Sequence, residues 1–298
     1  MTPVGASDTI AEFLDNVHHA ARMTLVLTHN LRSAANAMRI RVFREVGIVW
    51  ELSRNDFHAR FAGSYFGFWW AFVQPLATIL LFWFVFRIGF RMTHAPGGAP
   101  YGLWLAAGLA PWFFFSDGWT TASAALTDYS FLVKKVVFRI DLLPLVKVVS
   151  AFLFHVAFLL VLTALTLILR QKPSWHLLQL PYYGMCLFAL TLVLGLLTAS
   201  ILPFFRDLSQ LLAIVLQFGM WLTPILWSAE MIPVQYRWMF KLNPVAYVVE
   251  GYRDALFGQA WIWQHAATTL GFWLLTLALG WLAVHVHRRL RPHFADVL

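Results

Sequence analysis

An acidic side chain inside a long apolar run is the feature of this sequence with the clearest chemical meaning. Asp117 lies in the apolar run 102–124. Hydroxyl side chains accompany it at spacings that share one side of a helix: Ser116, Thr120, Thr121 and Ser123. Because a carboxylate inside a membrane helix is costly unless it faces a cavity or a partner, Asp117 predicts a polar pathway. A hydrogen bond between two helices is the alternative interpretation.

Aromatic side chains suggest a second kind of contact, because ring faces let the C–H surface of a sugar slide past without holding it. Phe, Trp and Tyr make up 17% of the chain, and in the run 67–89 they continue beyond what an interfacial belt needs. Lipid-facing rings are the alternative. We predict that a pathway is lined by Trp69, Trp70, Phe72, Trp83, Ser116, Asp117 and Thr120.

Several catalytic signatures are missing from the sequence. It has no GxxxxGK[ST] phosphate loop, so we expect no ATP binding by that route, and it has no H-E-x-x-H, CxxC or Asp-rich metal motif. The histidines are scattered, and one inside an apolar run, such as His155, is more typical of a satisfied core residue than of a ligand. We therefore expect no catalytic residue, no metal and no cofactor in this chain.

The composition is that of a polytopic membrane protein. Hydrophobic residues make up 60% of the chain, charged residues 12%, and the mean hydropathy is +0.67, whereas soluble domains are ~45–50% apolar. The net charge of +8 is spread over the loops and not gathered on one soluble face, which argues against a nucleic-acid partner. The single cysteine, Cys186, excludes an intramolecular disulfide.

Six long apolar runs predict an all-α integral membrane fold with six transmembrane helices, since each run is long enough to cross a bilayer core of ~30 Å. The expected spans, within a permease-like domain over 66–287, are roughly 67–89, 102–124, 145–169, 181–202, 208–227 and 262–286. With the N-terminus inside, the inner loops carry about twice as many Lys and Arg residues as the outer ones, so both termini are expected in the cytoplasm. The flanking tails are 1–42, which lacks the pattern of a cleavable signal peptide, and 288–298.

Three further segments flank or connect the spans. Residues 43–65 show apolar and charged faces at helical spacing and predict an amphipathic helix in the membrane interface, either a simple anchor or a lever that a cytoplasmic subunit grips. The inner connection 125–144 predicts a short helix on the cytoplasmic face. The outer connection 228–261 alternates short apolar runs with proline and glycine, which favours interfacial or re-entrant half-helices.

Several different short motifs lie along residues 50–290. They are Gly63-Ser64 with Gly67, Trp70 and Pro75, GLAPWFFFS at 108–116, LVKKVVF at 132–138, LLP at 142–144, FFRDL at 204–208 and NPVAYVVEGYR at 243–253. This set resembles the membrane subunit of polysaccharide-export ATP-binding-cassette (ABC) transporters, a family that exports O-antigen, capsular and teichoic-acid glycans. One departure is that Phe138-Arg139-Ile140-Asp141 stands where the family often has Phe-Pro-Arg-Glu.

The resemblance implies a homodimer in the bacterial inner membrane that works with two copies of a separate ABC ATPase, which binds ATP and Mg²⁺. The cargo would be a lipid-linked glycan that moves through a channel between the two permease copies. The implied ATPase-coupling residues are Lys134, Lys135, Arg139, Arg54, Arg60, Arg206 and Asp207. The implied exit-gate residues are Asn243, Pro244, Glu250, Tyr252 and Arg253.

Glu250 and Arg253 are three residues apart, so on a helix their side chains can form an ion pair.

Two other functions stay open at this point. The same fold could export a lipid or a hydrophobic drug, because abundant aromatic residues with few intramembrane charges suit that cargo too. A membrane-embedded glycosyl or prenyl transferase would need paired acids or a metal site, and the acidic residues Asp128, Asp141 and Asp207 are separated in the sequence.

Overall fold

A computed structural model describes residues 43–60, 63, 65–91, 98–130, 140–170 and 174–297. The chain divides into two compact units, 1–51 and 52–298. In the first, residues 43–51 are helical, and the predicted tail 1–42 lies outside the described residues. The second unit begins with the helical segment 52–59 and contains every element named below. Its regular elements are helices, as expected for an all-α fold.

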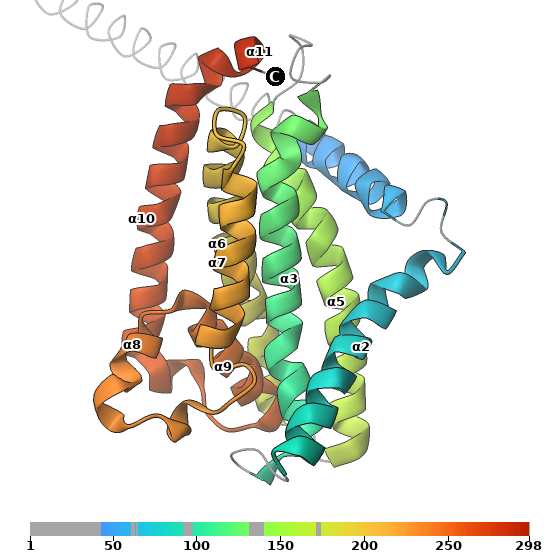
Figure 1. Cartoon of the computed structure of the whole chain (residues 1–298), viewed down its shortest axis with the longest axis vertical. Coiled ribbons are helices and arrows are strands. Elements are labelled where there is room, and N and C mark those ends of the chain that lie inside the picture. Colours follow the sequence, from blue (N-terminus) through green and yellow to red (C-terminus); the bar gives the residue numbers. More distant parts are fainter. Residues whose placement is uncertain are drawn as a thin grey trace, which may run out of the picture. The chain divides into compact units, whose positions relative to one another are not determined.

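The first long helix of this unit is continuous in direction but changes its hydrogen-bonding pattern along its length. It consists of η1 (Gly67–Trp69), α2 (Trp70–Phe84) and the π-helical turn η2 (Val85–Gly89) (Figure 1). Pro75 lies inside α2 and cannot donate a main-chain hydrogen bond. Ile79 is the only buried residue of α2, so most of this helix is exposed in the single chain.

The core of the unit is formed by long helices around α3 (Tyr101–Asp128). This helix packs against α5 (Leu143–Arg170), α6 (Leu180–Ile201) and α9 (Pro244–Phe257), and α10 (Ala266–Leu290) packs on α6. Small residues permit the closest approach of α3 and α6. A Cβ atom at Gly195 would lie 2.6 Å from the Cβ of Ala122, and one at Gly118 would lie 2.9 Å from Thr191.

The fifth apolar helix is shorter than its apolar run. Helix α7 covers Leu208–Leu222, whereas the predicted span continued to residue 227, so that boundary was wrong. The reason is local. Proline disfavours a helical conformation in the residue before it, and Thr223, which precedes Pro224, is extended with φ −82° and ψ 136°.

The predicted outer connection forms a series of short helices. They are η6 (Ala229–Met231), η7 (Val234–Tyr236), α8 (Arg237–Lys241), α9 and η8 (Ile262–His265). Gly258 ends α9 in a left-handed conformation with φ 69°, as glycine often does after a helix. At the other end of the unit, η9 (Arg291–His293) and α11 (Phe294–Val297) follow α10, and η4 (Ile140–Leu142) precedes α5. Before α6, η5 (Trp175–Gln179) packs against α9, so it lies with the outer connection.

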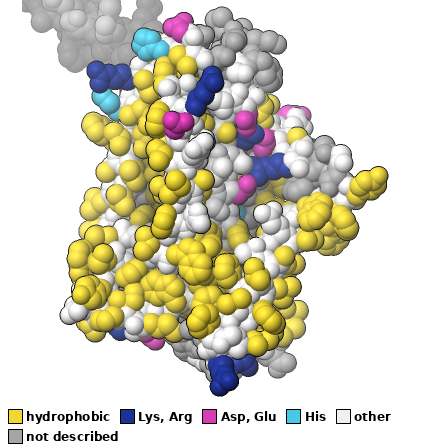
Figure 2. Space-filling view, viewed as in Figure 1, with side chains coloured by type: hydrophobic (Ala, Val, Ile, Leu, Met, Phe, Trp, Pro, Cys, Tyr) yellow, Lys and Arg dark blue, Asp and Glu magenta, His cyan; other side chains and the backbone are white. Residues whose placement is uncertain are grey.

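Among the described residues, four helical stretches are long and apolar enough to cross a membrane: Trp70–Gly89, Ile140–Leu169, Trp175–Ile201 and Ile262–His293. Helix α7 is apolar but has only 15 residues. Figure 2 shows hydrophobic side chains over most of the visible face, with charged side chains gathered mainly toward the α11 end. Leu270, Leu274 and Leu277 of α10 are each at least 60% exposed, which fits contact with lipid.

Candidate transport site

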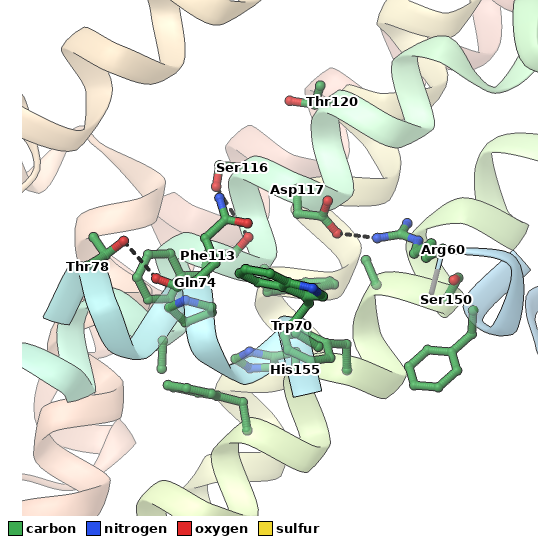
Figure 3. A pocket seen from close by; sticks show the side chains of 18 residues that line it. Arg60, Trp70, Gln74, Thr78, Phe113, Ser116, Asp117, Thr120, Ser150 and His155 are labelled. Atoms are coloured by element: carbon green, nitrogen blue, oxygen red, sulfur yellow. Dashed lines mark hydrogen bonds and ion pairs between the residues drawn. The ribbon is translucent and has the colours of Figure 1, made fainter. Parts of the chain in front are cut away.

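A cavity of about 660 Å³ lies between α2, α3, α5 and the end of the helical segment 52–59 (Figure 3). Four of the seven predicted pathway residues line it: Trp70, Ser116, Asp117 and Thr120. The other polar groups on its wall are Arg60, Gln74, Thr78, Ser150 and His155. The rings on its wall, besides Trp70, are Phe57, Phe113, Phe114, Phe154 and Phe158. The structure therefore brings Ser116, Asp117 and Thr120 together with aromatic rings from α2, α3, α5 and the segment 52–59.

The remaining three pathway residues lie outside the cavity wall. Trp69 precedes α2 and is 69% exposed. The ring of Phe72 packs against Phe154 at 5.5 Å, behind the wall. Trp83 lies near the other end of α2, where its indole approaches Gly102 so closely that a Cβ atom there would be 3.0 Å away.

Aromatic rings and hydroxyl groups on one wall give the cavity a definite chemical character. Flat rings contact the C–H face of a sugar or an apolar chain, while hydroxyl and amide groups can hydrogen-bond to its polar edges. Ser116 and Thr121 satisfy their hydroxyl donors on carbonyls of their own helix, at 3.2 Å and 2.8 Å. The oxygen lone pairs of Ser116, on the cavity wall, stay available to a ligand.

An ion pair closes one side of the cavity. The Arg60 guanidinium donates a 2.7 Å hydrogen bond from Nη1 to Oδ2 of Asp117, and the dashed line in Figure 3 marks this contact. A second donor, Nη2, approaches the hydroxyl of Thr121 at 3.4 Å. Arg60 was predicted as a coupling residue and Asp117 as a pathway residue, and the structure joins the two in one contact.

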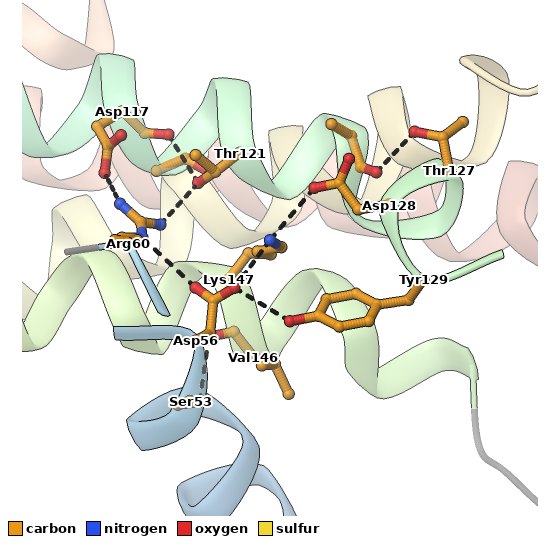
Figure 4. A network of polar contacts seen from close by, with 12 residues as sticks. Ser53, Asp56, Arg60, Asp117, Thr121, Thr127, Asp128, Tyr129, Val146 and Lys147 are labelled. Carbon is orange, nitrogen blue, oxygen red and sulfur yellow. Dashed lines mark hydrogen bonds and ion pairs between the residues drawn. The ribbon is translucent and has the colours of Figure 1, made fainter. Parts of the chain in front are cut away.

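Arg60 belongs to a larger network centred on the buried carboxylate of Asp56 (Figure 4). Oδ1 of Asp56 accepts from Lys147 Nζ at 2.8 Å and from the Tyr129 hydroxyl at 3.0 Å, and Oδ2 faces Arg60 Nε at 3.4 Å. Lys147 also contacts Asp128 at 3.2 Å. The network therefore ties the segment 52–60 to both α3 and α5.

The charge state of Asp56 follows from this environment. Burial alone would raise the pKa of the carboxyl, but the hydrogen bond and charge of Lys147 and the charge of Arg60 act more strongly in the opposite direction. The net result is a pKa below the ordinary value, so Asp56 is ionised at neutral pH.

Sequence reasoning missed the centre of this network. Asp56 lies within the predicted amphipathic segment 43–65 and Lys147 within the predicted span 145–169, and neither was expected to contribute to the site. One signal was present, because Asp56 and Arg60 are four residues apart and can meet on one helix face. Lys147 is 91 positions from Asp56 in the sequence, so spacing could not show that its Nζ lies 2.8 Å from Oδ1 of Asp56.

A second polar network fixes the extended segment after α7. Arg253 of α9 is buried and donates from Nη1 to the carbonyl of Pro224 and from Nη2 to that of Ile225, both at 2.7 Å. Its guanidinium also lies 3.4 Å from the ring centroid of Trp104. The hydroxyl of Tyr101 donates to the next carbonyl, that of Leu226, at 2.9 Å. The main-chain carbonyls of residues 224–226 lie outside a helix, and the side chains of Arg253 and Tyr101 supply their hydrogen bonds.

Four of the five predicted exit-gate residues lie in or beside this second network. We call Asn243, Pro244, Tyr252 and Arg253 the α9 latch. The Asn243 side chain accepts from the amide of Val245 at 3.0 Å, which caps α9, and donates to Thr223 Oγ1 at 2.9 Å. Pro244 occupies the first turn of α9, where its missing N–H has no cost. Tyr252 meets His155 Nε2 at 2.7 Å, so α9 is joined to a residue on the cavity wall.

The ion pair between Glu250 and Arg253 stays a prediction. The hydrogen bonds of Arg253 described above go to main-chain carbonyls, and its ring contact is with Trp104. Glu250 lies on the exposed face of α9. A guanidinium has five donors, so it can bind a set of unpaired carbonyls in addition to a carboxylate.

Of the other predicted coupling residues, the three that the structure describes join neither network. Arg54 is exposed on the segment 52–59, and Arg206 and Asp207 are exposed in the turn between α6 and α7. Lys134, Lys135 and Arg139 lie outside the described residues.

Comparisons with known proteins are consistent along most of the chain. A family model described as an ABC-2 type transporter matches residues 48–257. The chain is 24% identical over 268 residues to the O-antigen export system permease protein RfbA of Klebsiella pneumoniae, covering 88% of this chain and 100% of that protein. It is 27% identical over 267 residues to the protein of the same name from Myxococcus xanthus, covering 86% and 99%. It is 24% identical over 209 residues to the polysialic acid transport protein KpsM of Escherichia coli, covering 68% and 78%.

Proposed function

The chain belongs to the ABC-2 type transporter family, and from this premise we propose that it is the permease subunit of an exporter for a lipid-linked polysaccharide in the bacterial inner membrane. The observation that carries the proposal is its similarity, over nearly their full length, to permeases named for O-antigen export. Two copies of a separate ABC ATPase bind ATP and Mg²⁺ and drive transport, while this chain supplies the path. It crosses the membrane six times with both termini in the cytoplasm.

The cavity between α2, α3 and α5 supports a polysaccharide as cargo. Rings of Trp70 and Phe113 on its wall face the same space as the hydroxyls of Ser116 and Thr120. This mixture suits a sugar, which has apolar C–H faces and polar edges, better than it suits a purely apolar molecule.

The exposed faces of α2 and α7 support a homodimer with the channel between its copies. The two helices touch through Phe82 and Trp221, whose ring centroids are 6.3 Å apart. Only one residue of each helix is buried, Ile79 in α2 and Leu212 in α7. Large apolar side chains on both helices thus remain for a second copy to cover.

The Asp56 network supports coupling between the ATPase and the path. ATP can drive transport only if its binding favours one channel conformation over another. The segment 52–60 carries Asp56 and Arg60, and Arg60 holds Asp117 on the cavity wall. A displacement of this segment by a cytoplasmic partner would therefore move a charged group of the path.

The first experiment is purification of the chain from its native membrane in mild detergent, with mass spectrometry of co-purifying proteins. We expect an ABC ATPase at one copy per permease, and deletion of the gene should remove the surface polysaccharide. A monodisperse, intact chain without an ATPase would contradict the transport proposal. Activity of that chain alone on a polyprenyl substrate would favour a transferase, and export of small molecules without a glycan defect would favour a lipid or drug exporter.

A second experiment tests the cavity with matched variants. We expect Trp70→Ala and Asp117→Asn to lower polysaccharide export several-fold while the complex with the ATPase still assembles. Trp69→Ala is the control, because this neighbouring tryptophan is exposed outside the cavity. Equal export by all three variants would remove the cavity from the path.

A further inference from the structure

A buried histidine joins three elements at the end of the unit that is far from the α9 latch. His287 of α10 is 6% exposed. Its Nε2 lies 2.8 Å from Oδ1 of Asp141 in η4, and its Nδ1 lies 2.8 Å from the hydroxyl of Ser200 in α6. Arg291 of η9 approaches the other carboxylate oxygen of Asp141 at 3.2 Å.

The partners of the two ring nitrogens are oxygen atoms on different elements. The Ser200 hydroxyl is also 2.7 Å from the carbonyl of Leu196, and a carbonyl can only accept. With the hydroxyl proton directed there, the Ser200 oxygen is placed to accept from Nδ1 of His287. Nε2 faces a carboxylate oxygen, which accepts from it.

This contact fixes the place where α5 begins. Asp141 lies in η4, directly before Leu143, the first residue of α5. Beside it, the ring of Phe294 in α11 is 1% exposed and packs on His287 at 5.6 Å. Phe294 also packs on Phe204 at 5.9 Å, in the turn that precedes α7. The C-terminal end is thus built into the contact region of α5, α6 and α7.

We propose that His287 is a positioning residue that holds the first turns of α5 against α6 and α10. The consequence for transport rests on the proposed function, because the predicted ATPase-contacting residues Arg206 and Asp207 lie in the turn that Phe294 supports. The charged groups that face His287 are Asp141 of η4 and, through that carboxylate, Arg291 of η9. The facing residues of α6 and α11 are uncharged: Ser200 and Phe294.

Two substitutions separate the two ring contacts of His287. In His287→Gln the amide nitrogen can occupy the position of Nε2 and still donate to Asp141. In His287→Asn the shorter side chain places its amide nitrogen near Nδ1, so it can reach Ser200 but not Asp141. His285→Asn is the control, because His285 is exposed and stacks on Trp281 on the outer side of α10.

Hydrogen exchange on the full chain in lipid nanodiscs measures the positioning directly. We expect His287→Asn to increase exchange in the first turns of α5 roughly tenfold, since a hydrogen bond to a charged group is lost. His287→Gln and His285→Asn should stay close to the unmodified chain. Equal protection in the Asn and Gln variants, whether kept or lost, would overturn the proposal, because packing alone would then explain the site.

With the ATPase present, His287→Asn should export less polysaccharide per ATP hydrolysed. If no ATPase partner exists, the exchange results still decide the role of His287, so the two proposals can fail separately.

Discussion

Replacing Arg253 tests whether the α9 latch holds the segment after α7. In Arg253→Met the carbonyls of Pro224 and Ile225 lose charge-assisted hydrogen bonds of 2.7 Å. Each such bond contributes ~1.5–3 kcal/mol, so losing both would cost about 3–6 kcal/mol. Part of this loss is offset, because burying a charge itself costs several kcal/mol. We therefore expect a net destabilisation of about 2–4 kcal/mol, which lies in the upper part of the usual range for single substitutions.

The assay is thermal unfolding of the detergent-solubilised chain, with Glu250→Ala as the matched control on the same helix. A loss of this size should lower Tm by roughly 5–10 °C in Arg253→Met, whereas the change at exposed Glu250 should stay within about 0.5 kcal/mol. An equal fall in both variants would mean that the Glu250–Arg253 ion pair is the relevant contact. An unchanged Tm in Arg253→Met would refute the argument from unpaired carbonyls. Export should fall with Arg253→Met only, if the latch belongs to the path.

Two further substitutions test the packing and the charge network. Asp56→Asn should lower Tm at neutral pH and flatten its pH dependence: the pKa of Asp56 lies below its ordinary 3.8, so its stabilisation is present above about pH 4 and is lost as the pH falls further. Parallel Tm curves for the two proteins between about pH 7 and pH 3 would contradict this. Gly251→Ala should destabilise by at least ~1–3 kcal/mol, because its Cβ would overlap the ring of Tyr183. Gly271→Ala, with nothing within 4 Å, should raise Tm slightly if it changes it at all.

Helix positions could be predicted from the sequence because they depend on apolar run length. The spans expected at 145–169 and 181–202 match α5 and α6 to within two residues at each end. The end of α7 failed because the apolar run continues past the helix, and Pro224 counts as apolar while it prevents helix formation before it. Within the part of the chain that the structure describes, length and composition alone support four spanning helices, so the six-span topology remains part of the proposal.

The candidate site was predicted in parts that the sequence could not join. Asp117, Ser116, Thr120 and Trp70 were recognised from residue type and spacing, and they share one cavity. Thr121 and Ser123 do not line it, and the hydroxyl of Ser123 contacts Thr198 of α6. Their partners were not recognised, because Arg60 and Asp117 are 57 positions apart. Periodicity reports which side of a helix a residue occupies, but it carries no information on which other helix faces that side. The contacts of Lys147 and Arg253 needed the fold for the same reason.

The two networks act beside α2 and α7, each of which has one buried residue, and this bears on how a path could open. In the spanning stretch that contains α2, 11% of the apolar window is buried, against 50% in the stretch that contains α6. Helices with so few packed contacts can shift at lower cost than α3 or α6, whose close approach leaves no room between Gly195 and Ala122. Arg60, which precedes α2 in the chain, is held by Asp117, and the segment after α7 is held by Arg253, so the chain beside each of these helices is fixed to the core. Transport that involves α2 and α7 would then depend on the Arg60–Asp117 contact and on the hydrogen bonds of Arg253. Variants of Asp117 and Arg253 should therefore change export before they disrupt assembly of the complex.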